Sequence, residues 1–168
     1  MKTILLLVIV TATVAVAHAQ RARSVLLPAP EAKRLAKQCS RPSPSDFTDT
    51  WVPTVDEIKT MEARLKDIAK LKVKSCCIVG DQVENPQEWY LQYAALVRKG
   101  KKIIYISGIS VTEPERGPCF DKDGIVTDEH CEFWKHHAEV VCDGGTQWGV
   151  IYDVSTGKFS DLAVNGVG

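Results

Sequence analysis

The chain has 168 residues, and its 21 basic side chains balance its 21 acidic ones. This neutral balance argues against nucleic acid as the main partner, because nucleic-acid-binding domains concentrate positive charge. The length suits one domain with a hydrophobic core once a leader has been removed.

The N-terminal segment has the order of a secretory signal peptide. Lys2 is followed by an apolar run over residues 4–16 and then by Ala17-His18-Ala19, a small-x-small cleavage site. The run is shorter than the roughly twenty apolar residues that cross a membrane as a helix. We therefore expect residues 1–19 to be a signal peptide cleaved after Ala19, a secreted or periplasmic protein, and no stable membrane anchor after cleavage.

All six cysteines follow the cleavage site and are candidates for disulfides: Cys39, Cys76, Cys77, Cys119, Cys131 and Cys142. An exported chain reaches an oxidising compartment in which disulfides persist. Cys119 with Cys131 would close the turn-rich stretch between them. The adjacent Cys76 and Cys77 would be strained if joined to each other, so we expect them to reach two different partners. The remaining candidates are Cys39 and Cys142.

Residues 20–50 are rich in proline, serine and basic side chains. Prolines at positions 28, 30, 42 and 44 interrupt any long element. A helical turn or two over residues 31–37 would be marginal in water on its own. We expect an extended lead segment, solvated and held at Cys39, ahead of a single domain over residues 51–168.

An amphipathic helix is predicted to open this domain. Thr54 is placed to cap it, and Glu57, three residues later, can complete a capping box. Behind the cap, apolar residues recur at spacings of three and four: Val55, Ile58, Met61, Leu65, Ile68 and Leu71. We expect one long helix ending near Lys72, with its apolar stripe packed on a sheet.

The rest of the chain has the pattern of strands. Aromatic and β-branched residues cluster in segments separated by turn residues, with the glycine of Arg98-Lys99-Gly100-Lys101 in a first hairpin and Asp143-Gly144-Gly145-Thr146 in a second. Val154-Ser155-Thr156-Gly157 forms a third turn. The predicted strands cover residues 89–97, 102–109, 138–142, 147–152 and 158–164. The predicted fold class is α+β, with the long helix on an antiparallel sheet of about five strands.

One helix followed by antiparallel hairpins resembles the cystatin-type arrangement. The resemblance covers topology alone, since the Gln-x-Val-x-Gly loop with which cystatins enter a protease is absent. The first hairpin carries Arg98-Lys99-Gly100-Lys101 in its place. Protease inhibition would therefore follow from fold analogy only.

The last third of the chain carries a second resemblance. Its motifs are Val141-Cys142-Asp143-Gly144-Gly145, Trp148-Gly149-Val150-Ile151-Tyr152-Asp153, Thr156-Gly157-Lys158-Phe159 and Asn165-Gly166. This series is similar to a group of small exported bacterial proteins of unassigned function, with patches of likeness from Trp51 onward. The resemblance implies a bacterial envelope setting and assigns no chemistry.

A cluster of His130, Cys131, His136 and His137 is the strongest candidate for chemistry. Such groups can hold zinc or copper, but partners at Cys-x₂-Cys spacing are missing, and an oxidised Cys131 would not be a ligand. A solvent-facing loop is the favoured interpretation. No cofactor is expected.

Two further patterns are candidates for a binding site. Asp121-x-Asp123-Gly124 resembles the middle of a calcium loop, but the pattern fails at its two end positions, so an acidic turn is the better interpretation. Among the four tryptophans, those beside loops, Trp51 and Trp134, are candidates for stacking on a glycan, with packing in the core as the favoured alternative.

No signature of nucleophilic catalysis or phosphate binding is present in the sequence. The sequence therefore favours a noncatalytic secreted or periplasmic binding protein, of the inhibitor, immunity or envelope-interaction type, whose partner is a protein or a cell-wall component. The alternative is a metal-binding or thiol-dependent enzyme that uses the cluster over residues 131–137.

Overall fold

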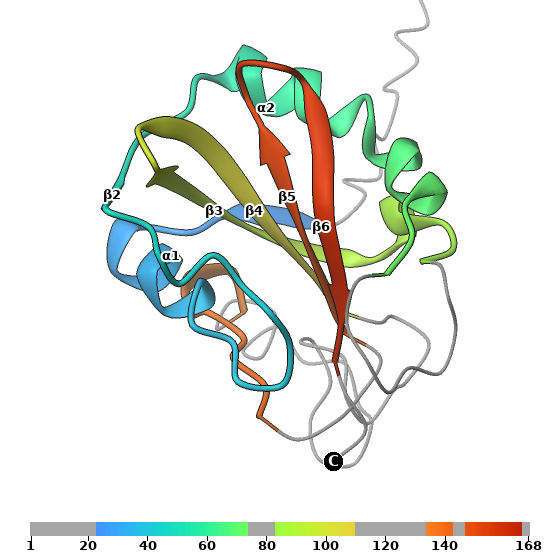
Figure 1. Ribbon diagram of the computed structural model, residues 1–168, viewed down its shortest axis with the longest axis horizontal. Helices are drawn as coiled ribbons and strands as arrows, with labels where there is room; N and C mark the ends of the chain where they lie inside the picture. The colour runs from blue at the N-terminus through green and yellow to red at the C-terminus, as the bar shows by residue number, and fades with distance from the viewer. Residues whose placement is uncertain (1–22, 74–82, 110–133, 143–146, 166–168) are drawn as a thin grey trace, which may run out of the picture.

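The computed structural model describes residues 23–73, 83–109, 134–142 and 147–165. In these ranges six strands form one sheet in the order β1-β3-β4-β5-β6, with β2 also paired to β3 (Figure 1). The strands are β1 Ser24–Leu26, β2 Asp49–Thr50, β3 Tyr90–Arg98, β4 Lys101–Ile109, β5 Trp148–Asp153 and β6 Lys158–Val164. Every pair is antiparallel except β1 with β3. The predicted α+β class with a largely antiparallel sheet is confirmed.

The first predicted hairpin is also confirmed. β3 and β4 pair along their whole length, and Arg98 faces Lys101 across the turn. The two residues between them, Lys99 and Gly100, have φ angles of 51° and 73°. Two successive positive φ angles belong to the tight turn whose twist matches that of the strands it joins.

β5 and β6 form the last hairpin, as predicted. Asp153 holds the turn, because its carboxylate accepts hydrogen bonds from the Ser155 hydroxyl and from the N–H groups of Thr156 and Ser155. These bonds lower the pKa of Asp153. Further along β6 the pairing shifts register opposite Gly149 and Ile151, and Asp161 has a φ of 55°. β6 therefore carries a bulge at Asp161.

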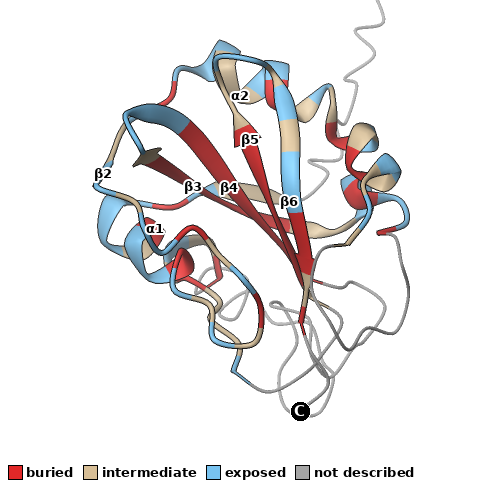
Figure 2. Cartoon of the chain, in the orientation of Figure 1, coloured by how far each residue is buried: buried red, intermediate tan, exposed pale blue. Residues whose placement is uncertain are grey.

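Helices cover both faces of the sheet. α1 (Ala29–Leu35) packs on one face, where its buried Ala32 and Leu35 join a core cluster with residues of β3, β4 and β5. α2 (Val55–Glu62) lies on the other face, where Met61 joins a larger cluster. Figure 2 shows the central strands buried between these two layers.

The segment over residues 20–50 corrects the expectation of an extended lead. From Ser24 onward it contributes β1, α1 and β2, and both strands pair with the same edge of β3. The helical turn anticipated near residue 31 is α1, which is stabilised by packing on the sheet rather than by its own propensity. The boundary at residue 51 stays a prediction.

The single long helix was wrong. α2 ends at Glu62, and a 3₁₀ helix, η1 (Leu65–Lys70), follows it, so the described part of the chain holds no long helix for a cystatin-like arrangement. A 3₁₀ helix repeats every three residues, so Leu65 and Ile68 share one face and both are buried. The predicted capping box at Thr54 and Glu57 is present.

The predicted strand over residues 138–142 is also absent. This segment runs beside the loop that follows α1 and is held there by Gln38 and Ser40. The Gln38 amide donates to the Glu139 carbonyl at 2.9 Å, and Ser40 donates to the Val141 carbonyl through both N–H and hydroxyl. Side-chain hydrogen bonds thus satisfy backbone groups that a strand would have paired.

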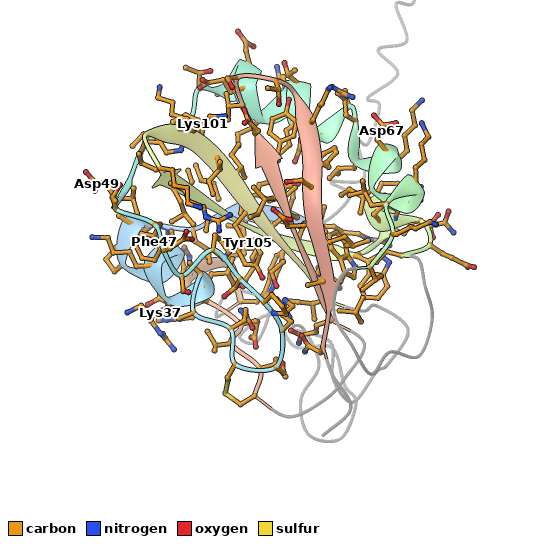
Figure 3. The ribbon with its side chains drawn as sticks, viewed as in Figure 1. Lys37, Phe47, Asp49, Asp67, Lys101 and Tyr105 are labelled. Carbon is orange, nitrogen blue, oxygen red and sulfur yellow. A yellow bond between two sulfur atoms is a disulfide. The ribbon has the colours of Figure 1, made fainter. Side chains whose placement is uncertain are left out.

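The same two segments are joined by a disulfide between Cys39 and Cys142, drawn as a yellow bond in Figure 3. Cys39 and Cys142 are therefore confirmed as disulfide cysteines, but they bond to each other and not to Cys76 and Cys77, for which they were the remaining candidates. Cys76, Cys77, Cys119 and Cys131 lie outside the described residues. A disulfide is consistent with the oxidising compartment expected for an exported chain. Within the ranges described, no helix is both long and apolar enough to cross a membrane.

Candidate functional site

The two tryptophans considered for glycan stacking are both in contact with the protein. Trp134 is 1% exposed and packs edge-on against Tyr90, so it presents no open face. Trp51 is half-buried, and its indole N–H lies 3.1 Å from the Leu96 carbonyl oxygen. Lys102 lies over its ring at 4.7 Å from the centroid. These contacts favour packing for both side chains.

The proposed metal cluster falls partly outside the described residues, because His130 and Cys131 are not among them. The His137 carbonyl accepts a hydrogen bond from buried Gln92, and His136 lines an open, largely apolar groove of about 570 Å³ with residues such as Leu26 and Val52. In the described ranges no three histidine, cysteine or acidic side chains are grouped as metal ligands. The calcium-like turn at Asp121 also lies outside those ranges.

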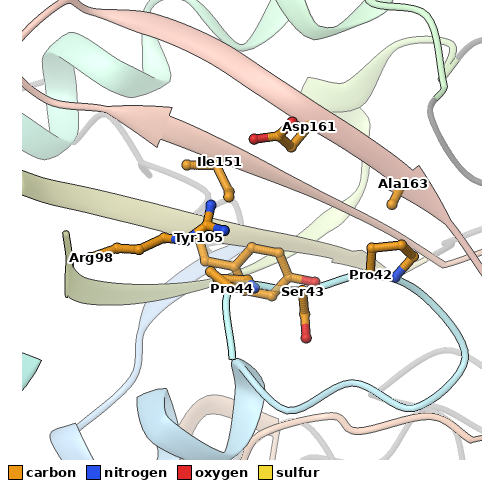
Figure 4. Close-up of a pocket in the computed structure, with 8 residues that line it drawn as sticks. All are labelled: Pro42, Ser43, Pro44, Arg98, Tyr105, Ile151, Asp161 and Ala163. Carbon is orange, nitrogen blue, oxygen red and sulfur yellow. The ribbon is translucent and has the colours of Figure 1, made fainter. Parts of the chain in front are cut away.

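A pocket of about 240 Å³ lies on the α1 face of the sheet, beyond the area that α1 covers (Figure 4). We call it the Arg98 pocket. It is lined by Pro42, Ser43, Pro44, Arg98, Tyr105, Ile151, Asp161 and Ala163. One wall is the loop after α1 and the other is the surface of strands β4, β5 and β6. Figure 3 shows Tyr105 near the middle of the molecule, where these parts meet.

A buried arginine stands behind this pocket. Arg41 is only 4% exposed, and its guanidinium donates to the Tyr105 hydroxyl at 3.0 Å, the Ser107 hydroxyl at 2.8 Å and the Asn165 side-chain oxygen. All three acceptors are neutral, and no carboxylate of the described residues pairs with Arg41. A buried cation without an anion is costly, so this arrangement calls for a functional explanation.

Tyr105 connects Arg41 to the pocket. The ring is 1% exposed, and its hydroxyl oxygen accepts the Arg41 Nε–H bond. Among the described residues, nothing accepts the proton of this hydroxyl. Tyr105 therefore carries a hydrogen-bond donor that is polarised by the cation behind it and can serve a ligand.

Arg98 supplies the second group of donors. It leaves β3 on the same face of the sheet and extends along the pocket toward Tyr105 and Ile151 (Figure 4). Its Nε donates to the Asp46 carboxylate, which lowers the pKa of Asp46. In the part of the chain described, neither terminal Nη nitrogen has an acceptor. The Arg98 side chain is 28% exposed, so a ligand could reach these nitrogens.

Local sequence features fix the shape of the pocket. The loop wall is held rigid by Pro42 and Pro44 and is anchored by the Cys39–Cys142 disulfide just before it. In β5, Gly149 leaves room for the Tyr105 hydroxyl and the Arg41 side chain. A Cβ atom there would overlap the Tyr105 hydroxyl oxygen and lie 2.9 Å from Arg41 Nε.

Sequence reasoning missed this site because it assigned the basic residues near Arg41 to a solvated tether. One signal was available. A glycine inside a strand, such as Gly149, often marks the close approach of another group. No local pattern, however, indicates that residue 41 folds back onto a strand more than sixty positions later.

Comparison of the chain with models of known protein families, with curated proteins and with solved structures gives no match. The Arg98 pocket and its chemistry are therefore the basis for a functional proposal.

Proposed function

We propose that this chain is a noncatalytic exported binding protein and that its ligand, or a segment of its partner, enters the Arg98 pocket. The observation that carries the proposal is the set of unsatisfied donors in a formed pocket, namely the Nη groups of Arg98 and the Tyr105 hydroxyl. Polar groups placed at a largely apolar pocket are the usual means of orienting a ligand.

The state of Ser43 supports binding rather than catalysis. Its hydroxyl donates to the Ala36 carbonyl at 2.8 Å and accepts from the Gln38 N–H at 3.2 Å. A nucleophilic serine needs a general base to take its proton, whereas this proton is held by a backbone carbonyl. Ser43 therefore serves to shape the loop wall.

A small-fragment screen tests this proposal. The exported chain would be mixed with a chemically diverse fragment set, including neutral, cationic and anionic compounds, and binding would be detected by ligand-observed NMR. Hits would then be located from amide shifts in ¹⁵N-labelled protein. We expect hits to shift the amides of Ser43, Ile151 and Ala163 and to be recovered chemically unchanged.

Two outcomes contradict the proposal. If the hits perturb only residues of the groove around Leu26 and Val52, the ligand site lies elsewhere. If fragments that occupy the Arg98 pocket are converted to products, the protein is an enzyme.

A further inference from the structure

We infer that the Arg98 pocket takes a carboxylate on a compact apolar body. This inference rests on the proposed function and specifies its ligand class. The unsatisfied groups named above are all donors, so the complementary ligand group is an acceptor. Arginine terminal nitrogens present two parallel donors, a geometry that matches the two oxygens of a carboxylate.

The charges around the pocket also favour an anion. Asp46 contacts both Arg98 and Lys99, at 3.9 Å for the latter, so one carboxylate is shared by two cations. Arg41 adds a buried positive charge, and the three groups that accept its hydrogen bonds, on Tyr105, Ser107 and Asn165, are all neutral. A bound anion would compensate this charge through the Tyr105 hydroxyl, in a region of reduced dielectric where the interaction is strengthened.

The remaining walls bound the apolar part of the ligand. Asp161 lines the pocket from the bulge of β6, across from Pro44 and Tyr105 (Figure 4). Pro42, Pro44, Ile151 and Ala163 supply the apolar surface for the rest of the ligand.

Calorimetric titration of the exported chain with benzoate and with its neutral isostere benzamide tests this inference. We expect benzoate to bind at least about tenfold more tightly than benzamide, the difference that one or two charge-assisted hydrogen bonds produce. N-acetyl-alanyl-alanine and its C-terminal amide would be titrated in parallel. Preference for the peptide acid over benzoate would assign the carboxylate to a peptide terminus, and the reverse order would assign it to a small free acid.

Two variants locate the effect. Arg98→Gln removes the Nη donors and should weaken benzoate binding by about tenfold or more. Lys101→Gln is the matched control, because it also removes one positive charge, directly opposite Arg98 in the hairpin but outside the pocket. The affinity of this variant for benzoate should stay within about twofold of that of the unmodified protein.

Equal affinity for benzoate and benzamide, tighter binding of inorganic phosphate than of benzoate, or equal losses in Arg98→Gln and Lys101→Gln would overturn the inference. Neutral fragments from the screen above would still occupy the pocket in those cases, so the proposed binding function would stand. If neither acids nor neutral fragments occupy the pocket, both the inference and the proposed function fail.

Discussion

Replacing Gly149 by alanine tests the packing that places Tyr105 and Arg41 at the pocket. The added Cβ would overlap the Tyr105 hydroxyl oxygen, lie 2.8 Å from ring atom Cζ and lie 2.9 Å from Arg41 Nε. Neither neighbour can move into solvent, since Tyr105 is 1% and Arg41 4% exposed. Overpacking of a rigid site costs about 1–3 kcal/mol, and we expect a loss of about 2–3 kcal/mol in the free energy of unfolding.

The measurement is thermal and urea unfolding of the protein followed by circular dichroism. For a chain of this length the expected loss lowers Tm by roughly 5–10 °C. A double-mutant cycle with Tyr105→Phe identifies the cause, because phenylalanine lacks the overlapping oxygen. Tyr105→Phe alone should cost about 1–3 kcal/mol by leaving the Arg41 Nε–H without an acceptor. The double variant should lose at least about 1 kcal/mol less than the sum of the single changes.

A Gly149→Ala cost below about 0.5 kcal/mol would refute this packing. Strict additivity with Tyr105→Phe would also refute it, because two residues in contact are expected to couple.

Three further changes probe the fold. Replacing both Cys39 and Cys142 with serine opens a bridge across 103 residues and should cost about 2–4 kcal/mol in urea unfolding; an unchanged midpoint would show that the bridge does not form. Thr54→Ala removes the α2 cap and should cost about 1 kcal/mol at neutral pH. Hydrogen bonds from the Thr54 N–H and hydroxyl lower the pKa of Glu57. The stabilisation that Glu57 provides is therefore present above its ordinary pKa and is lost as pH falls through the lowered value. A Thr54→Ala cost independent of pH would contradict this pairing. Burial raises the pKa of Glu139, so its ionised carboxylate opposes folding at neutral pH. Glu139→Gln should therefore raise the free energy of unfolding at neutral pH, and this gain should vanish in acid. Destabilisation by Glu139→Gln at pH 7 would contradict the role of burial.

The parts of the fold that could be predicted are those set by neighbouring residues. The β3–β4 hairpin depends on the Lys99-Gly100 turn, and the β5–β6 hairpin depends on Asp153 and Gly157. The α2 capping box is a local pattern of the same kind. In each case the turn or cap residue and the element it limits lie within a few positions, so the pattern is visible in the sequence.

The parts that could not be predicted depend on contacts between distant segments. The periodicity of residues 55–71 fits a long helix and equally fits an α helix followed by a 3₁₀ helix, because both place Leu65 and Ile68 on a buried face. The break between α2 and η1 coincides with a tertiary contact. Arg64, at the junction, donates a hydrogen bond to the Gly157 carbonyl in the distant β5–β6 turn.

The candidate site depends even more strongly on contacts between segments that are distant in the sequence. Arg41 is a basic residue just before Pro42 and Pro44 in a segment rich in serine, a composition typical of a solvated segment. Its burial follows from acceptors supplied by β4 and by Asn165 after β6, and from the space left by Gly149. Arg98 looks like a hairpin charge in the sequence, yet it projects along the pocket because β3 places it on the α1 face.

A crystal structure of the protein soaked with benzoate would report both the conformation of the buried arginine and the position of the ligand. We expect Arg41 over Gly149, hydrogen-bonded to the Tyr105 hydroxyl, and benzoate in the Arg98 pocket with its carboxylate on Arg98. An Arg41 side chain directed into solvent, or benzoate bound only outside this pocket, would contradict it.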